Sequence, residues 1–280
     1  MTLNDIYHAI DPVALSLGPL QIRWYGLAYV AGFICAFLVI AKLSQRWKIR
    51  IDDDAFFTVV FCVIFGVILG GRLGYVLVYG DGYYLQHPEK ILAFNEGGMS
   101  FHGGLVGVII GGVIAAKITK IPFLTLADMG VVGVPIGLFF GRCANFINGE
   151  LWGAPTDMPW GVVFGGAAGT MPRHPSQLYE ALLEGVVLFI ILFALSRKTP
   201  ARPRGTFFGT FLLFYGLFRF TIEFIRQPDA QIGYLLGTHW FTMGQALSIP
   251  LMVAGVVFLI YACKTKKPQM GLPDSEISQP

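Results

Sequence analysis

Residues 55–79 read AFFTVVFCVIFGVILGGRLGYVLVY and contain one charged side chain, Arg72. A membrane-spanning helix needs about 20 predominantly apolar residues, so this stretch predicts such a helix. The rest of the 280-residue chain has a similar character, because 55% of its residues are hydrophobic, 13% are charged and the mean hydropathy is +0.64. Since globular domains carry about 25% charged residues, this composition excludes a disordered chain and an ordinary soluble domain.

Six other apolar runs resemble this stretch in length and composition. The seven runs cover residues 24–41, 55–79, 99–116, 123–141, 177–196, 205–226 and 241–263. They predict an all-α, polytopic integral membrane protein with seven transmembrane helices in a single membrane domain, residues 1–263. The Lys-rich segment 264–280 is predicted to be a disordered cytoplasmic tail. No Lys or Arg precedes Arg23, so the basic start of a cleavable signal peptide is missing, and we expect the first run to remain in the mature protein.

Basic residues predict the orientation of these helices. The loops after the first, third, fifth and seventh runs hold 13 of the 20 Lys and Arg residues. By the positive-inside rule these loops lie in the cytoplasm, which places the N-terminus outside and the C-terminus inside. The chain shows no internal repeat, and seven spans do not divide into two inverted halves, which weighs against a transporter.

The remaining seven basic residues lie at or near the outer ends of the runs or in outer loops. They are Arg23, Arg72, Lys90, Arg142, Arg173, Arg219 and Arg226. A charge at mid-membrane costs about 2.5–3.5 kcal/mol on translocon scales, so such arginines need partners or a wet cavity, unless they extend to the outer headgroups. Because guanidinium groups bind phosphate through two parallel hydrogen bonds, the set predicts an outward-facing site for a phosphate-bearing ligand such as an anionic lipid headgroup.

One predicted helix carries a stripe of polar side chains. Tyr215, Arg219 and Glu223 occur at i, i+4 and i+8, and Arg226 follows three residues later. Residues at this spacing share a helix face, so we expect Glu223 to hold Arg219 in place.

Two other stripes are open to structural explanations. Arg72, Tyr75 and Tyr79 repeat a helical spacing, but tyrosines also collect at membrane interfaces. Glu180 and Glu184 form an i, i+4 pair that either serves the site or only locks helices together through ion pairs.

The segment GGMSFHGG, residues 97–104, places His102 between pairs of glycines at the outer end of the third run. A histidine here can act as a general base near neutral pH, although lone histidines are more often structural. Gly103, Gly107 and Gly111 recur every four residues, which predicts close helix packing. The acidic run 52–54 is expected to cap the following helix.

The most polar stretch, Gly141–Gly153, reads GRCANFINGELWG. It contains a guanidinium, two carboxamides and a carboxylate between Arg142 and Glu150. The stretch resembles the signature GRxGNFxNxExxG of the prolipoprotein diacylglyceryl transferases and departs from it at one fixed position, where Ala144 replaces Gly. The extra methyl group affects local packing beside Arg142 and leaves the charged groups intact.

The resemblance extends over nearly the whole chain. Further matching blocks, in the order of the family, are Arg23–Gly26, Gly70–Tyr75, Gly97–Gly104, His174–Glu180, Arg219–Asp229 and Gly244–Pro250. It implies a seven-span enzyme of the bacterial inner membrane, with its active site on the periplasmic side. The enzyme would transfer the diacylglyceryl group of phosphatidylglycerol to the lipobox cysteine thiol in the signal peptide of a preprolipoprotein, forming a thioether and releasing glycerol phosphate.

The same resemblance implies roles for individual residues. The catalytic set is Arg142, which binds the lipid headgroup, Arg219, and His102 as a proposed base. Tyr25, Asn145, Glu150, Gly153 and Tyr215 match other site positions of the family. Together with Arg142 itself and with Arg72, Tyr75 and Glu223 from the polar stripes, they form the expected substrate-binding set.

The expected partners are phosphatidylglycerol, the lipobox signal peptide and membrane lipids, with no nucleic acid, no metal and no cofactor. The four cysteines lie far apart, and their spacing indicates neither a disulfide framework nor a structural metal.

Two alternative functions use the same residues differently. Cys143 beside Arg142 would be the nucleophile of an acyl-enzyme route. The arginines would otherwise line the outer vestibule of an anion channel or transporter, although no charged path continues through the inner halves of the helices.

Overall fold

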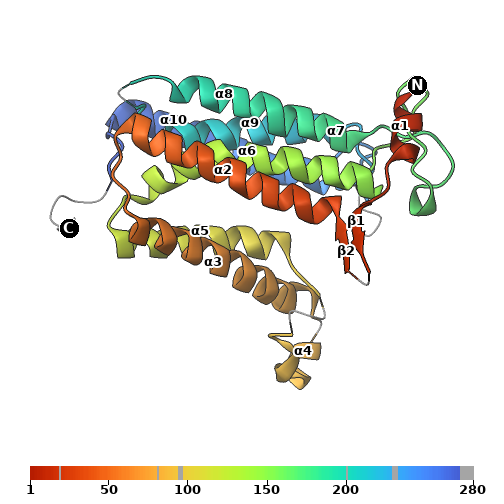
Figure 1. Cartoon of the computed structure of the whole chain (residues 1–280), viewed down its shortest axis with the longest axis horizontal. Helices are drawn as coiled ribbons and strands as arrows, with labels where there is room; N and C mark the ends of the chain where they lie inside the picture. Colours follow the sequence, from red (N-terminus) through yellow and green to blue (C-terminus); the bar gives the residue numbers. More distant parts are fainter. Residues whose placement is uncertain (19, 81, 94–96, 200, 229–232, 272–280) are drawn as a thin grey trace. The chain divides into compact units, whose positions relative to one another are not determined.

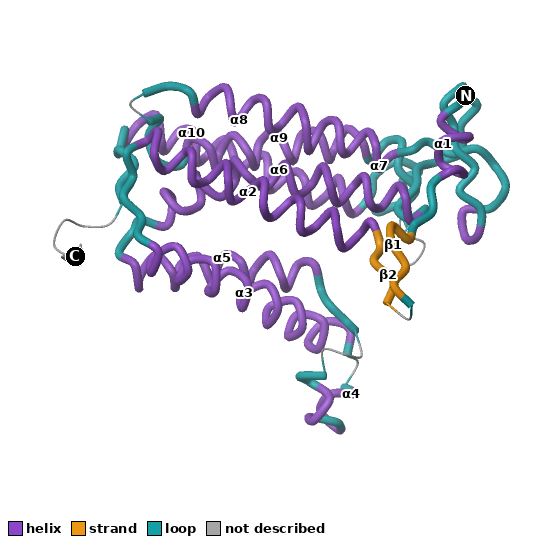
Figure 2. The backbone as a smooth tube through the Cα atoms, in the orientation of Figure 1, coloured by secondary structure: helices purple, strands orange, loops and turns teal. Residues whose placement is uncertain are grey.

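The computed structural model describes the whole chain except residues 19, 81, 94–96, 200, 229–232 and 272–280 (Figure 1). The described residues are predominantly helical, with one two-stranded antiparallel hairpin (Figure 2). They group into two compact units, Met1–Leu43 with Asp128–Pro268, and Ser44–Ala127 with Gln269–Pro280. The helical prediction is therefore confirmed, whereas the hairpin was not expected from the sequence.

The first unit contains most of the labelled elements. They are α1 (Leu3–Ala9), β1 (Val13–Leu17), β2 (Leu20–Arg23), most of α2 (Trp24–Trp47), most of α6 (Phe123–Asn148), the short 3₁₀ helix η3 (Gly166–Ala168), α7 (Ser176–Glu180), the π-helical segment η4 (Ala181–Val187), α8 (Leu188–Ser196), α9 (Thr206–Ile222) and α10 (Met243–Thr265). The segments α7, η4 and α8 follow one another directly, so the predicted run 177–196 is one helix interrupted by a π-helical stretch.

Glycines bring helices of this unit into backbone contact. A Cβ atom on Gly255 of α10 would lie 2.6 Å from the backbone nitrogen of Leu213 in α9. A Cβ on Gly185 of η4 would lie 2.7 Å from Cβ of Phe139 in α6. Small residues allow this close approach, which supplies the packing that holds helices together in a bilayer. The second contact matters for the site, because Phe139 precedes Arg142 by one helical turn and Gly185 follows Glu184.

The second unit is built on α3 (Asp53–Tyr79) and α5 (Phe101–Thr119), together with α4 (Tyr83–Gln86) and the 3₁₀ helix η1 (Pro88–Lys90). Gly103 and Gly107 of α5 face Gly66 and Gly70 of α3, and a Cβ on Gly107 would lie 1.8 Å from the carbonyl oxygen of Gly66. The prediction that the four-residue glycine stripe packs a helix is confirmed.

Aspartates cap two of the long helices. Oδ1 of Asp52 accepts a hydrogen bond of 2.8 Å from the backbone nitrogen of Ala55, so the predicted cap of α3 is confirmed. Asp128 on α6 is fully buried, and its two carboxylate oxygens accept 2.7 Å hydrogen bonds from the backbone nitrogens of Gly205 and Phe208. A side chain of α6 thus satisfies the first turn of α9, a role that the sequence analysis did not assign.

Each of the seven predicted apolar runs corresponds to a helix. Among the described residues, five helices are long and apolar enough to cross a membrane: Trp24–Trp47, Asp53–Val78, Phe123–Asn148, Ser176–Ser196 and Met243–Thr265. The apolar helices Gly103–Thr119 and Thr206–Ile222 are shorter. The chain is therefore a helical membrane protein, while the number of spans and their orientation stay predictions.

The predicted tail begins within α10, which ends at Thr265. Arg204 holds the next residues, because its backbone nitrogen donates to the carbonyl oxygen of Lys267 at 2.9 Å and its Nε donates to that of Pro268 at 2.6 Å. Residues 272–280 of the tail lie outside the described residues.

Candidate active site

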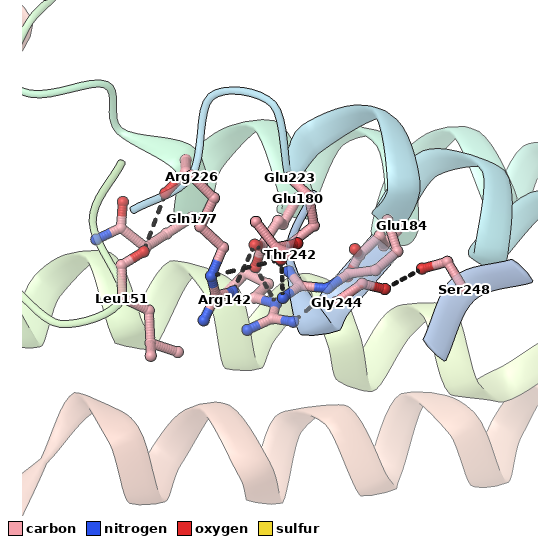
Figure 3. Close-up of polar contacts among 12 residues, drawn as sticks. Arg142, Leu151, Gln177, Glu180, Glu184, Glu223, Arg226, Thr242, Gly244 and Ser248 are labelled. Atoms are coloured by element: carbon pink, nitrogen blue, oxygen red, sulfur yellow. Dashed lines mark hydrogen bonds and ion pairs between the residues drawn. The ribbon is translucent and has the colours of Figure 1, made fainter. Parts of the chain in front are cut away.

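Three arginines and three glutamates converge in the first unit. They are Arg142 of α6, Glu180 of α7, Glu184 of η4, Arg219 of α9, and Glu223 and Arg226, which follow α9. We call these six residues the ion-pair cluster. Figure 3 shows the side chains of Arg142, Glu180, Glu223 and Arg226 turned toward one another. The arginine side chains are 11–17% exposed and the glutamates 0–4%, so the cluster is nearly dry.

Glu180 lies at the centre of the cluster. Its Oε1 lies 2.6 Å from Nη1 of Arg219 and 2.9 Å from Nη1 of Arg226, and its Oε2 lies 2.7 Å from Nε of Arg142. One fully buried carboxylate therefore contacts all three guanidinium groups. Removing one partner of a buried ion pair costs about 3–5 kcal/mol, so Glu180 fixes the positions of the arginines at the same time.

Glu223 forms a second centre. Its Oε1 contacts Nη2 of Arg219, which confirms the predicted pairing, and lies 3.8 Å from Nε of Arg226. Its Oε2 accepts a hydrogen bond from the hydroxyl of Thr242, the N-cap of α10. A Cβ on Gly244 would lie 2.4 Å from the carboxyl carbon of Glu223, so a larger residue there would displace the carboxylate. The carboxylate thus lies against the first turn of α10, where the helix dipole favours negative charge.

Glu184 is held less tightly. Its Oε2 lies 3.5 Å from Nη2 of Arg142, while its Oε1 has no hydrogen-bond partner among the described residues. The glutamate pair predicted from the sequence therefore consists of two unlike members, since Glu180 has three short contacts and Glu184 has one long contact. The π-helical turn and the contact between Gly185 and Phe139 set Glu184 beside Arg142.

The C-terminal end of α6 carries the polar residues of the signature. The carboxylate oxygen Oε1 of Glu150 accepts hydrogen bonds from the side-chain amides of Asn145 at 2.9 Å and Asn148 at 3.2 Å. Gln177 is fully buried and donates from Nε2 to the backbone oxygen of Glu150 at 2.6 Å. Since Gln177 lies on α7 with Glu180, it ties this turn to the centre of the cluster.

The turn after α6 has an unusual backbone. Leu151 has a φ angle of +60°, which a leucine adopts only at a cost of about 1–3 kcal/mol. The hydroxyl of Ser176, also on α7, donates to the carbonyl oxygen of Leu151 at 2.9 Å. The start of α7 therefore holds the signature turn at two successive residues.

Gly153 packs closely against two other segments. A Cβ at this position would lie 2.7 Å from the carbonyl oxygen of Ile225 and 2.8 Å from Cβ of His174. The backbone of Gly153 pairs with that of Arg226 in an isolated antiparallel bridge, and its nitrogen donates to the carbonyl oxygen of His174 at 2.9 Å. The glycine thus lets the signature segment run against the residues that carry Arg226.

Helix α1 supports the same segment, which the sequence analysis missed. Tyr7 packs edge-on against Phe146 and Phe164, with ring centroids 5.4 and 5.0 Å apart. Oδ1 of Asn4 accepts a hydrogen bond of 2.9 Å from the backbone nitrogen of Val163. An aromatic contact and a hydrogen bond therefore join the N-terminal helix to both sides of the signature turn.

Another polar chain, also missed, lies next to Glu180 in sequence. The hydroxyl of Tyr179 accepts a 2.6 Å hydrogen bond from Nε1 of Trp160 and lies 3.2 Å from Nδ1 of His174. Because Tyr179 accepts from Trp160, its own proton is free to point at His174. Burial lowers the pKa of His174 below its usual value of 6.5, which favours the neutral imidazole that accepts this proton.

The two tyrosines predicted for this unit lie on its helices. Tyr215 stacks on Phe211 with ring centroids 5.5 Å apart, and it lies close enough to Glu184 and Arg219 to interact with their charges. Tyr25 is half-buried in the first turn of α2. The structure thus brings Tyr215 to the ion-pair cluster.

Arg72, Tyr75 and His102 belong to the second unit. Arg72 is 1% exposed and donates to the carbonyl oxygens of Lys90, Ile91, Gly97 and Gly98. Its guanidinium carbon lies 6.0 Å from the ring centre of Tyr75. Arg72 thus joins the end of η1 to the two glycines that precede α5. The backbone of His102 is part of α5, while its side chain lies outside the described residues.

The fold and the cluster define a class: a helical membrane protein with a nearly dry, arginine-rich site in which carboxylates position the guanidinium groups. The family model described as prolipoprotein diacylglyceryl transferase matches residues 12–261. The chain belongs to this family and is a transferase. Its curated relatives include proteins named phosphatidylglycerol–prolipoprotein diacylglyceryl transferase.

The relatives match along almost their full length. The Geobacter sulfurreducens protein is 52% identical over 92% of this chain and 97% of its own. The proteins of Nitratidesulfovibrio vulgaris, strain DP4, and Cupriavidus metallidurans are each 49% identical, over 89% and 92% of this chain and 94% and 95% of their own lengths. This agreement favours the enzyme over the anion channel or transporter.

Proposed function

We propose that this chain transfers the sn-1,2-diacylglyceryl group of phosphatidylglycerol to the lipobox cysteine thiol of a preprolipoprotein, forming a thioether and releasing glycerol phosphate. The names of the relatives supply the substrates. The observation that supports the site is the convergence of Arg142, Arg219 and Arg226 on the single carboxylate of Glu180. Arginines fixed in this way lose little freedom when they bind a phosphate.

Arg142 is the best placed residue to bind the lipid phosphate. Its Nε and Nη2 face Glu180 and Glu184, and its side chain is 17% exposed, the highest value of the three arginines. Among the described residues these two ion pairs leave the remaining amino group, Nη1, for the ligand. Asn145 and Glu150 lie one to two turns further along the chain, where they would contact the headgroup beyond the phosphate.

Arg219 is assigned to the transition state. Attack of sulfur on the glyceryl carbon forms a C–S bond and breaks a C–O bond, so negative charge accumulates on the departing phosphate. A guanidinium already oriented by Glu180 and Glu223 stabilises this charge without reorganising, and the nearly dry surroundings strengthen the interaction. The thiol, with a pKa of about 8.5, also reacts faster when a base or a positive field raises its thiolate fraction. We assign the base role to His102 on the basis of the family resemblance.

We further propose seven spans in the bacterial inner membrane, with the N-terminus and the site on the periplasmic side and the C-terminus in the cytoplasm. The distribution of Lys and Arg supports this orientation. The hydrogen bond between Asn4 and Val163 supports a common side for the N-terminus and the signature segment.

The test is a mass and gel-shift assay with purified protein, phosphatidylglycerol vesicles and a lipobox peptide. We expect the mass of one diacylglyceryl group on the cysteine. A peptide with serine in place of the cysteine, vesicles of phosphatidylcholine and the Arg142→Ala variant should each show no transfer. Folded protein that leaves the peptide unmodified, or that conducts anions across proteoliposomes, would refute the proposal.

A further inference from the structure

The ion-pair cluster carries equal numbers of positive and negative groups. Three guanidinium groups face three carboxylates, and none of the six side chains is more than 17% exposed. A phosphate diester adds one negative charge to this set. An uncompensated charge in a dry site raises the free energy strongly. The cluster therefore needs one further positive charge or one proton when such a ligand binds.

The three carboxylates differ in how firmly guanidinium groups hold them. Glu180 has contacts of 2.6, 2.7 and 2.9 Å, and Glu223 has Arg219, the hydroxyl of Thr242 and the first turn of α10. Glu184 has one contact of 3.5 Å, and its Oε1 lacks a hydrogen-bond partner among the described residues. Glu184 is therefore the carboxylate whose negative charge is stabilised least by contacts.

Among the described residues, the one ion-pair partner of Glu184 is Arg142, which is also the residue that a phosphate would engage. Arg142 reaches Glu184 through Nη2, and its side chain is 17% exposed, compared with 16% for Arg219 and 11% for Arg226. A phosphate that pairs with this guanidinium competes with Glu184 and brings a second anion to it. The other groups that act on Glu184 are Glu180 on α7 and Arg219 and Tyr215 on α9. Of these, Arg219 is already shared between Glu180 and Glu223.

We propose that Glu184 takes up one proton when a phosphate diester binds to Arg142, and releases it when the phosphate leaves. The proton comes from solvent and forms an O–H bond on the carboxyl group, so the occupied cluster remains neutral. Glu184 is then a positioning residue. Once protonated, its carboxyl group no longer competes with the phosphate for the guanidinium group of Arg142. The inference rests on the proposed function only for the identity of the lipid.

Calorimetry can count this proton directly. Short-chain phosphatidylglycerol is titrated into the detergent-solubilised protein in buffers that differ in ionisation enthalpy. In alkaline buffers, where the carboxyl group is ionised before the lipid binds, we expect about one proton taken up per lipid, and an affinity that falls by up to about tenfold for each unit of rising pH. Diacylglycerol with the same chains, which lacks the phosphate, should cause no uptake.

The variant Glu184→Gln mimics the protonated carboxyl and should bind the lipid without proton uptake and with little pH dependence. Glu89→Gln removes a 64% exposed carboxylate on η1 and should take up protons like the wild type. No uptake by the wild type, or equal uptake by Glu184→Gln, would overturn the proposal.

A second readout applies if Glu184→Gln does not fold. Infrared difference spectra of lipid binding should show a protonated carboxyl band in the wild type, and this band should shift in Glu184→Asp. Its absence, or an unchanged position in the variant, would also overturn the proposal. Proton uptake without peptide modification would refute only the proposed transfer, while transfer without proton uptake would refute only this role of Glu184.

Discussion

Nη1 of Arg219 lies 2.6 Å from Oε1 of Glu180, although 39 residues separate the two and they belong to different helices. The same guanidinium contacts Glu223 through Nη2. Arg219 therefore has two carboxylate partners, whereas the sequence predicted one. This arrangement changes what should follow from mutating each member of the cluster.

Arg142→Lys should lose most of the transferase activity. The guanidinium uses Nε for Glu180 and Nη2 for Glu184, and a single ammonium group cannot keep both contacts and bind a phosphate as well. We expect kcat/KM to fall by more than about tenfold, equivalent to about 1.4 kcal/mol. The exposed Arg46 offers a matched control, because Arg46→Lys should retain normal kinetics. Near-normal turnover of Arg142→Lys would mean that Arg142 acts only as a point charge.

Arg219→Ala should abolish transfer while phosphatidylglycerol still binds at Arg142. Because the lost contact is assigned to the transition state, kcat should fall more than the apparent KM for lipid rises. Steady-state kinetics with varied lipid, together with direct lipid binding, measure this difference. An active but unstable Arg219→Ala protein would instead make Arg219 a structural ion pair.

Glu180→Ala should destabilise the protein more than Glu223→Ala. Loss of Glu180 takes a carboxylate from three guanidinium groups, and breaking buried pairs costs about 3–5 kcal/mol. In Glu223→Ala, Arg219 keeps its contact with Glu180. The double variant Arg219→Ala/Glu223→Ala should be inactive and should not regain thermal stability relative to Glu223→Ala, because Arg219 is still paired with Glu180 after Glu223 is lost. Thermal unfolding in detergent checks this order, and equal losses for both glutamates would contradict the central position of Glu180.

Gly107→Ala should separate α3 from α5. The new Cβ would lie 1.8 Å from the carbonyl oxygen of Gly66, so the backbones must move apart, which typically costs about 1–3 kcal/mol. Gly104→Ala is the matched control on the same helix, because its Cβ would meet its nearest neighbour at 3.7 Å. Unfolding temperatures of the two variants give the comparison. A Gly107→Ala protein as stable as Gly104→Ala would show that the two helices do not pack through this glycine.

Acidification should weaken the fold through His174. Burial lowers the pKa of this histidine below 6.5, so the unfolded chain binds the proton more readily than the folded chain. Stability contributed by neutral His174 is complete above about pH 6.5 and is lost as the pH falls toward the lowered folded-state pKa. Unfolding temperatures across this range should decline less steeply in His174→Gln. Parallel curves for the two proteins would argue against this source of acid sensitivity.

Reporter fusions test the proposed orientation. A reporter after Pro280 should be cytoplasmic, whereas tags at Met1 and in the loop after Trp152 should be accessible from outside. Labelling of the Trp152 loop from the cytoplasm would end the proposed mechanism, because the signature would face the wrong compartment.

The sequence predicted what depends on local patterns. The seven helices follow from apolar length, the cap at Asp52 from its position before a helix, and the pairing of Arg219 with Glu223 from i, i+4 spacing. The close packing at Gly107 could also be predicted from the sequence, because small residues at every fourth position bring helix backbones together.

The central position of Glu180 could not be predicted in this way. Its partners lie 38, 39 and 46 residues away, and no local spacing relates them; only the packing of α6, α7 and α9 brings them together. Arg72 shows a similar case. Its place in the substrate-binding set stays a prediction, but the sequence did not show that its guanidinium donates to four backbone carbonyl oxygens, because such partners leave no pattern of residue types.

The hydrogen bond between Asn4 and Val163 has a consequence for the order of assembly, because it joins residues 159 positions apart. At translation rates of about 5–20 residues per second, Asn4 is added to the chain about 8–30 s before Val163. Phe146 and Phe164, the aromatic partners of Tyr7, are also added only near the end of that interval. The signature turn therefore acquires its support from α1 only after most of the chain has been synthesised, so the site is among the last parts of the protein to mature.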